Sequence, residues 1–155
     1  MYRTQRPPLL EIGTLIQDGR YVVEEFIGQG GAGQVYRVRQ QSLGISRALK
    51  LLAPHDERRA TEFYDTFGNE VQHLLKLTHR NIIKILDYDP LGVEPTSAES
   101  RSSGKHPYYI MEHAEGQLKS VAVPMIATKE ILLDVLYQIF DGLVYAHASG
   151  VYHSD

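Results

Sequence analysis

The sequence predicts an α+β fold with a β-rich first part and a helical C-terminal part. Short runs rich in β-branched and aromatic residues occupy residues 21–52, and four glycines interrupt them within residues 28–33. Apolar residues after position 128 recur instead at helical spacing. The 155 residues suffice for one domain, and 43% hydrophobic with 23% charged residues is typical of soluble globular proteins. Collagen-like, coiled-coil and wholly disordered structures are therefore disfavoured.

The β-rich part is expected to contain five strands and one helix. Residues 56–77, which follow Pro54, combine charges with good helix formers and predict a helix with one buried face. The apolar residues of that face are Phe63, Phe67, Val71, Leu74 and Leu75. The predicted strands span residues 21–27, 35–38, 45–52, 81–88 and 108–111.

A loop and a final helix complete the predicted order. Residues 90–107 contain two glycines, four serines and three prolines, which predicts a mobile, solvated insertion. Thr128 is placed to cap a last helix that Gly150 would end. The apolar face of this helix comprises Leu132, Val135, Leu136, Ile139, Leu143 and Ala146.

Charge and cysteine content limit the partners and the compartment. The net charge of -3 gives no overall attraction to nucleic acid or to anionic membranes. Without cysteine, disulfides and thiolate chemistry are excluded, which is most natural in a reducing cytoplasm. The N-terminus lacks the apolar core of a signal peptide, and Asp134 and Asp141 interrupt the longest apolar stretch. We expect a cytoplasmic protein without a membrane segment.

Histidine is abundant, but its spacing does not indicate a metal site. No two histidines form an H-x-x-x-H or H-E-x-x-H pair on a predicted helix beside a carboxylate. The histidines considered are His73, His79, His106, His113, His147 and His153. We therefore expect no metal site built from them.

The glycine-rich segment fits a phosphate-binding turn. Residues 28–33 follow a G-x-G-x-x-G pattern, whose small residues let backbone N–H groups approach phosphate oxygens. Dinucleotide-binding domains and protein kinases both use this pattern. Residues 35–38 read as strand rather than helix, and position 50 holds lysine rather than an acidic residue. Both features argue against the dinucleotide fold.

Four further motifs, in order along the chain, make the sequence resemble the protein kinase family. They correspond to the strand that carries the phosphate-binding lysine, the following helix with its turn into the next strand, the hinge, and the approach to the catalytic loop. In this sequence they read RALK at 47–50, Glu70 with HRNIIK at 79–84, YIMEHA at 109–114, and HASGVYHSD at 147–155. The opening DGRY at 18–21 and the glycine-rich loop look most like bacterial serine/threonine kinases.

The resemblance implies a fold and a domain organisation. The fold is a kinase N-lobe, with a five-stranded antiparallel sheet plus one helix, followed by the first helix or helices of a truncated helical C-lobe. Residues 1–20 would be an N-terminal extension, residues 21–114 the N-lobe with the insertion loop 90–107, and residues 115–155 the start of the C-lobe.

The resemblance also assigns candidate site residues. The loop would cover the ATP phosphates, Lys50 would contact the α- and β-phosphates while paired with Glu70, and Asp155 would accept the substrate hydroxyl proton. Met111 would be the gatekeeper, and Glu112 and Ala114 would offer backbone groups to adenine. The candidate ATP-binding residues are Ile27, Gly28, Gln29, Gly30, Gly31, Ala32, Gly33, Val35, Ala48, Lys50, Met111, Glu112 and Ala114.

Two departures from the family pattern qualify the expected activity. Ser154 stands where most kinases have an arginine that pairs with an activation-loop phosphate. The sequence ends at Asp155, before the Asn and the D-F-G Asp that hold Mg²⁺ in a complete kinase. We expect a part of a serine/threonine kinase with a protein substrate, inactive as this chain alone. The alternative is a catalytically dead nucleotide-binding or regulatory module. We expect either that the chain is a fragment of a longer protein or that a partner or a second copy covers the helix of residues 129–149.

Overall fold

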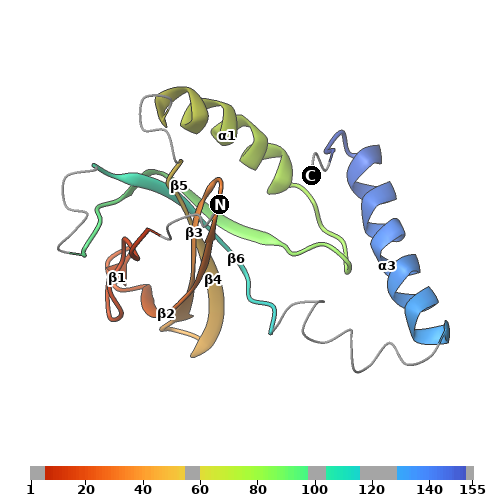
Figure 1. Ribbon diagram of the computed structural model, residues 1–155, viewed down its shortest axis with the longest axis horizontal. Coiled ribbons are helices and arrows are strands. Elements are labelled where there is room, and N and C mark those ends of the chain that lie inside the picture. The colour runs from red at the N-terminus through yellow and green to blue at the C-terminus, as the bar shows by residue number, and fades with distance from the viewer. Residues whose placement is uncertain (1–5, 55–59, 98–103, 116–128, 153–155) are drawn as a thin grey trace.

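One antiparallel sheet organises the computed structural model, which describes residues 6–54, 60–97, 104–115 and 129–152 (Figure 1). The sheet has six strands in the order β1-β2-β3-β4-β6-β5, and all neighbours are antiparallel. The strands are β1 (Leu15–Ile16), β2 (Tyr21–Gly30), β3 (Gly33–Gln40), β4 (Ile45–Leu52), β5 (Ile85–Val93) and β6 (His106–Glu112). The helices are α1 (Ala60–Leu74) and α3 (Lys129–Ala148). This arrangement confirms the predicted α+β architecture.

The sheet differs from the prediction at two places. The short strand β1 lies in the segment predicted as an N-terminal extension and pairs with β2 through Ile16 and Tyr21. Strand β5 begins only at Ile85, four residues after the predicted start, and continues to Val93, into the predicted loop, while β6 begins already at His106. Pro90 is tolerated because β5 is an edge strand, where a missing backbone N–H costs no ladder bond.

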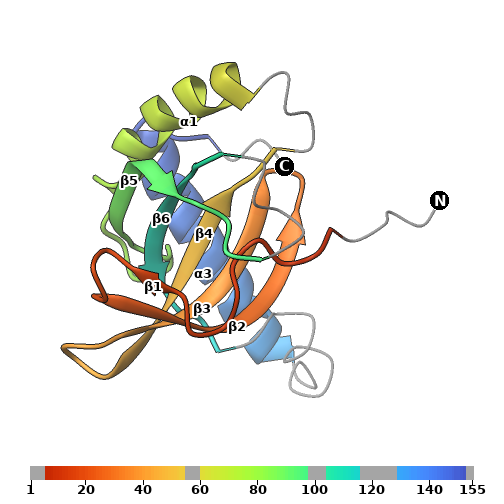
Figure 2. The ribbon, with the colours of Figure 1, turned by 90° about the vertical axis from the view of Figure 1, so that its left-hand side faces the viewer.

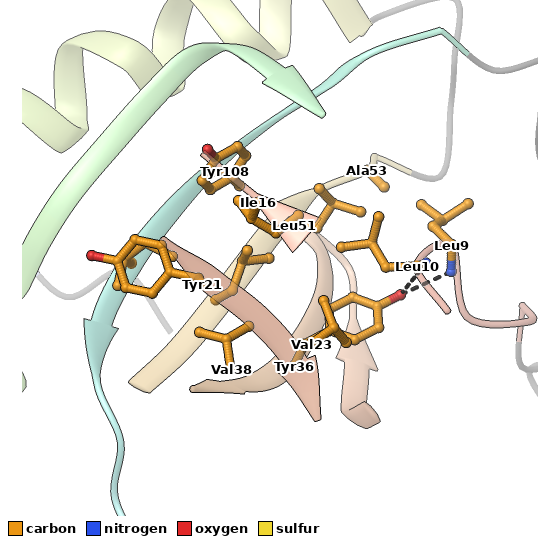
Figure 3. Close-up of a cluster of buried hydrophobic side chains, with 12 residues drawn as sticks. Leu9, Leu10, Ile16, Tyr21, Val23, Tyr36, Val38, Leu51, Ala53 and Tyr108 are labelled. Carbon is orange, nitrogen blue, oxygen red and sulfur yellow. Dashed lines mark hydrogen bonds between the residues drawn. The ribbon is translucent and has the colours of Figure 1, made fainter. Parts of the chain in front are cut away.

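The side chains of the sheet alternate between two apolar layers. Neighbours Tyr108 and Tyr109 point to opposite faces, as successive residues of a strand do. The layer between α1 and the sheet is formed by Val71 of the helix and by Leu52, Ile85 and Tyr109 of the strands. The outer layer (Figure 3) is formed by Leu9, Leu10, Ile16, Tyr21, Val23, Tyr36, Val38, Leu49, Leu51, Ala53, Tyr108 and Ile110.

Helix α1 is fixed to its layer by stacked aromatic rings. Phe67 stacks on Tyr109 with ring centroids 5.7 Å apart, and Phe63 stacks on Phe67 at 5.9 Å. Val71, one turn after Phe67, is fully buried against the sheet. The predicted spacing of this helix face is therefore confirmed, and it places α1 over the face that carries Tyr109.

Helix α3 touches the rest of the protein through a small contact. Figures 1 and 2 place it across the sheet from β1. His79 lies 3.3 Å from Asp141 and stacks on Tyr145, and the Asn81 amide donates to the Gln138 side chain at 3.0 Å. Its large exposed apolar residues are Ile131, Leu132, Leu133, Leu136, Tyr137, Ile139, Phe140 and Val144.

Replacing Tyr109 with Phe is expected to make stability less sensitive to alkaline pH. Burial raises the pKa of Tyr109 to about 12, from about 10 in an unfolded chain. Because the folded state holds the phenol proton more tightly than the unfolded state, the contribution of Tyr109 to the free energy of unfolding is fully present below the unfolded pKa. It is lost as the pH rises through the folded value, at up to about 1.4 kcal/mol per pH unit. Urea unfolding across this range measures the slope, which should be shallower in Tyr109→Phe.

The exposed Tyr137 provides the matched control, because it is 70% exposed and has no buried phenol to lose. Tyr137→Phe should retain the wild-type slope. Equal slopes in wild type and Tyr109→Phe would contradict the assignment of the alkaline loss to the buried phenol.

Alanine should lower the stability of the protein at position 33 but leave it almost unchanged at position 30. A Cβ on Gly33 would lie 1.9 Å from the Leu51 carbonyl oxygen, and its φ of +147° is unfavourable for other residues. Gly33→Ala should therefore cost about 2–4 kcal/mol of stability, through overlap and backbone strain. A Cβ on Gly30 would meet nothing within 4 Å. Gly30→Ala should unfold in urea almost like the wild type, and equal losses in both variants would refute the predicted difference.

Candidate functional site

The glycine-rich loop forms the tip of the β2–β3 hairpin. Gly30 pairs with Gly33, which leaves Gly31 and Ala32 as the turn. The N–H of Ala53 donates to the Ala32 carbonyl at 3.2 Å, so the tip is tied to the end of β4. An added Cβ at Gly28, Gly30 or Gly31 would meet nothing within 4 Å. Around these three positions the backbone is open to a ligand.

Lys50 lies in the middle of the sheet, on the face below this hairpin. Its cross-strand partners are Val35 on β3 and Tyr109 on β6. The Lys50 Nζ is 5.8 Å from the centre of the Tyr109 ring. Since Tyr109 packs under α1, the lysine shares its sheet face with that helix.

Residues predicted to line the adenine pocket share this face. Ala48 pairs with Met111, and Met111 pairs with Ile85 on β5. Ala48 is two residues from Lys50 on β4, so both side chains point to the same side. The alternation of the strands therefore places Val35, Ala48, Lys50 and Met111 on one surface.

A cavity lies between β2 and the hinge. It has a volume of about 420 Å³, and Ile27 and Ala114 both line it. The other lining residues are Glu25, Arg37, Ser46, His113 and Glu115. The cavity brings together two predicted ATP-binding residues that are 87 positions apart in the sequence.

Glu112 holds the hinge to the start of β5. Its backbone N–H donates to the Lys84 carbonyl at 3.0 Å, and its carboxylate accepts from the Lys84 N–H at 3.0 Å. Both bonds fix the direction in which the chain leaves β6 towards Ala114. The carboxylate has a structural role that the sequence did not indicate.

The side chains of two of the three predicted catalytic residues lie outside the described part of the structure. Glu70 belongs to α1, three residues after Phe67 and directly before Val71, but its side chain is outside the described part of the structure. Asp155 lies outside the described residues, as does His153. Pairing of Lys50 with Glu70 and the position of Asp155 therefore stay predictions.

His79 and His106 make contacts that stabilise the fold. His79 connects the turn before β5 to α3. His106 is buried, and its Nδ1 lies 3.0 Å from the Tyr64 hydroxyl and 3.2 Å from the Leu52 carbonyl. Within the described ranges, no group of three or more His, Asp or Glu side chains could hold a metal ion.

Sequence reasoning missed two polar side chains beside the glycine-rich loop. Gln34 and Tyr36 are buried on the outer face of β3, where they bind the backbone of residues 7–10. The available signal was a glutamine at an inward-facing position directly after the last loop glycine.

Comparisons with known proteins agree with the motif order. The model of the protein kinase domain family matches residues 21–155. The serine/threonine-protein kinase pkn2 of Myxococcus xanthus is 31% identical over 148 residues, which are 95% of this chain and 16% of pkn2. The probable serine/threonine-protein kinase PknB of Bifidobacterium longum is 29% identical, with 92% of this chain and 20% of the relative covered.

Solved structures show the same fold. The kinase domain of PknI from M. tuberculosis superposes with a TM-score of 0.67 at 23% identity. The alignment covers 94% of this chain and 54% of the PknI chain. The apo form of PpkA-294 gives a TM-score of 0.72 at 21% identity, with the same two shares covered.

The chain thus spans about half of these solved kinase structures and a fifth or less of the two curated relatives. Helix α3 is long and apolar enough, from Glu130 to Ala148, to cross a membrane by length and composition alone. The family match runs through this segment, which fits a helix of the kinase C-lobe better. From the family match, the order of the motifs and the shared fold, the chain belongs to the protein kinase family, and it is similar to bacterial serine/threonine kinases.

Proposed function

We propose that this chain is the ATP-binding portion of an enzyme that transfers the γ-phosphoryl group of ATP to a protein serine or threonine. One observation carries the proposal. Lys50 shares a sheet face with Val35, Ala48 and Met111, below a glycine hairpin whose backbone is open. This arrangement offers an apolar surface on which the adenine base can pack. It also offers the phosphates a cation, the lysine, together with backbone N–H groups.

The residues divide between the two ends of ATP. Residues 28–33 would cradle the phosphates, Lys50 would contact the α- and β-phosphates, and Glu70 would hold the lysine. Adenine would pack against the surface of Val35 and Ala48, near Ile27, with the backbone of Glu112 and Ala114 at its edge. The cavity shared by Ile27 and Ala114 supports this orientation.

Transfer itself would need one more group at the substrate hydroxyl. As that oxygen forms a bond to the γ-phosphorus and the bond to ADP breaks, Asp155 would accept the hydroxyl proton. Mg²⁺, when bound with ATP, supplies neutralisation of the phosphate charge. Its Asn and Asp ligands in the family lie after the position of Asp155, so we infer that residues 1–155 alone bind nucleotide without transferring phosphate.

The exposed apolar face of α3 supports the same inference. Leu132, Leu136 and Ile139 are each about two-fifths exposed, so each forgoes part of the roughly 1.5–3 kcal/mol that full burial of a large apolar side chain contributes. We propose that further kinase-domain sequence covers this face, or a partner or second copy where that sequence is missing. A cytoplasmic location, where ATP and protein substrates are available, fits a chain without cysteine.

A regulatory module that binds ATP without catalysis is the second candidate. Ser154, in place of the usual arginine, is the departure from the family pattern that prompts it, and it would make activation depend less on an activation-loop phosphate. The two candidates differ in phosphoryl transfer by the full-length protein and agree in nucleotide binding.

Lys50→Met and Asp155→Asn should separate binding from transfer in the full-length protein. Lys50→Met should weaken ATP binding by about tenfold or more, because it removes charge-assisted contacts to phosphate. Asp155→Asn should keep the ATP affinity but abolish transfer from labelled ATP to a general protein substrate. Calorimetry and a radiolabel assay measure the two effects.

Unchanged ATP affinity in Lys50→Met would show that this lysine does not face phosphate. Wild-type protein that binds ATP but transfers nothing to any of several protein substrates would support the regulatory module instead.

Glu70→Gln should weaken ATP binding less than Lys50→Met. The substitution removes the charge expected to orient Lys50, whereas the lysine itself would still reach the phosphates. Calorimetric titration of both variants under the same conditions gives the order of effects. A larger loss in Glu70→Gln would mean that the pairing is misassigned.

A further inference from the structure

Residues 6–11, called here the N-terminal strap, cross the outer face of the sheet beside the glycine-rich hairpin (Figure 3). Leu9 and Leu10 are 8% and 2% exposed and belong to the outer apolar layer. The strap has no strand partner along this stretch, so its backbone groups need bonds from side chains or loops. Two side chains of β3 supply several of them.

Gln34 binds the strap with both ends of its amide. Its Oε1 accepts from the Leu9 N–H at 2.8 Å, and its Nε2 donates to the Pro7 carbonyl at 2.9 Å. The same Nε2 lies 3.5 Å from the Gln29 side chain, within the glycine-rich loop. Gln34 is 2% exposed, follows Gly33 directly and pairs with Gln29 across the hairpin. A single side chain thus connects the strap to the base of the loop.

Tyr36 reinforces this connection one side chain further along the same face. Its hydroxyl accepts from the N–H groups of Leu9 at 2.8 Å and Leu10 at 3.1 Å, and donates to Gln34 Oε1 (Figure 3 shows the bonds to the strap). The Tyr36 side chain is fully buried, and burial raises the pKa of its hydroxyl. Water cannot replace these bonds in a buried site, so loss of either partner leaves polar groups unsatisfied.

The strap is also held on its far side, so it cannot follow the hairpin freely. The N–H of Thr96 donates to the Leu9 carbonyl at 2.9 Å, and the Glu11 N–H donates to Thr96 Oγ1 at 2.8 Å. The Arg6 guanidinium donates to the Pro54 carbonyl at 3.3 Å, just after β4. The strap therefore links the hairpin to the segment after β5 and to the end of β4.

We infer that Gln34 and Tyr36 are positioning residues, through which the N-terminal strap holds the glycine-rich hairpin in the geometry that binds nucleotide phosphates. The inference rests on the proposed ATP site. Gly28, Gly30 and Gly31 have no side chains to pack, so contacts within the loop cannot fix it. Gln34 points away from the phosphate side, because Val35 next to it faces Lys50. Its effect on nucleotide must therefore be transmitted through the hairpin.

The test compares Gln34→Leu and Tyr36→Phe with Gln40→Leu in the full-length protein. Gln40 is the matched control, since it lies on the same strand and face, is 9% exposed and bonds to Arg47, but is remote from the loop. Gln34→Leu and Tyr36→Phe should each bind ATP about fivefold more weakly than the wild type, which is the factor in affinity that one net hydrogen bond contributes. Gln40→Leu should keep wild-type affinity, whatever its melting temperature.

Hydrogen exchange without nucleotide gives a second readout, independent of ATP binding. In Gln34→Leu and Tyr36→Phe, amides of residues 28–34 and of the strap should exchange several times faster than in wild type. Amides of β6 should be unaffected. Tyr36→Phe retains the ring and is the milder change, so it keeps the test valid if Gln34→Leu fails to fold.

The outcomes separate this inference from the proposed function. Suppose that the wild type binds ATP and Lys50→Met weakens this binding. If Gln34→Leu and Tyr36→Phe then bind ATP like Gln40→Leu, with unchanged hydrogen exchange in the loop, the positioning role is wrong and the ATP site stands. If wild type binds no ATP, the proposed function fails. Faster exchange in residues 28–34 would still show that the strap holds the hairpin.

Discussion

The close approach of Gly33 to the Leu51 carbonyl fixes how β3 lies against β4, and the site depends on this register. With no Cβ at position 33, the two backbones meet where any other residue would overlap. Val35 then pairs with Lys50, and Arg37 with Ala48. A slip of one residue would turn each of these side chains to the opposite face of the sheet. The lysine would then point into the outer apolar layer.

The two faces of the sheet have different roles: one faces the candidate ligand, and the other packs into the outer apolar layer. On one face, α1 covers Tyr109 and leaves the surface around Ala48 and Lys50 to the candidate ligand. On the other, the outer layer is closed by residues from the N-terminus, including Leu10 and Ile16. Because successive strand residues alternate between the faces, the outer-layer residues Tyr36 and Leu49 directly adjoin residues that line the site. Packing and binding are coupled through β3 and β4.

Much of this arrangement follows from local patterns in the sequence. The alternation around Lys50, the glycine spacing and the helical spacing of Phe67 and Val71 depend on neighbours in the chain, so one sequence suffices to predict them. The burial of residues 6–11 cannot be predicted from such local patterns. Pro7, Pro8 and charged neighbours give no period, and their place depends on hydrogen bonds to Gln34, 27 residues away. The extension of β5 likewise depends on its pairing with β6.

A loop that must expose its backbone to phosphate cannot be stiffened by its own side chains. Glycine makes the close approach feasible but loses the most conformational entropy when it is ordered. The compensation has to come from groups that lie just outside the loop. At one end of the hairpin the Ala32 carbonyl is bonded to Ala53, and at its base Gln34 is bonded to the strap. A buried polar residue beside the last glycine is thus the expected complement of an open glycine loop.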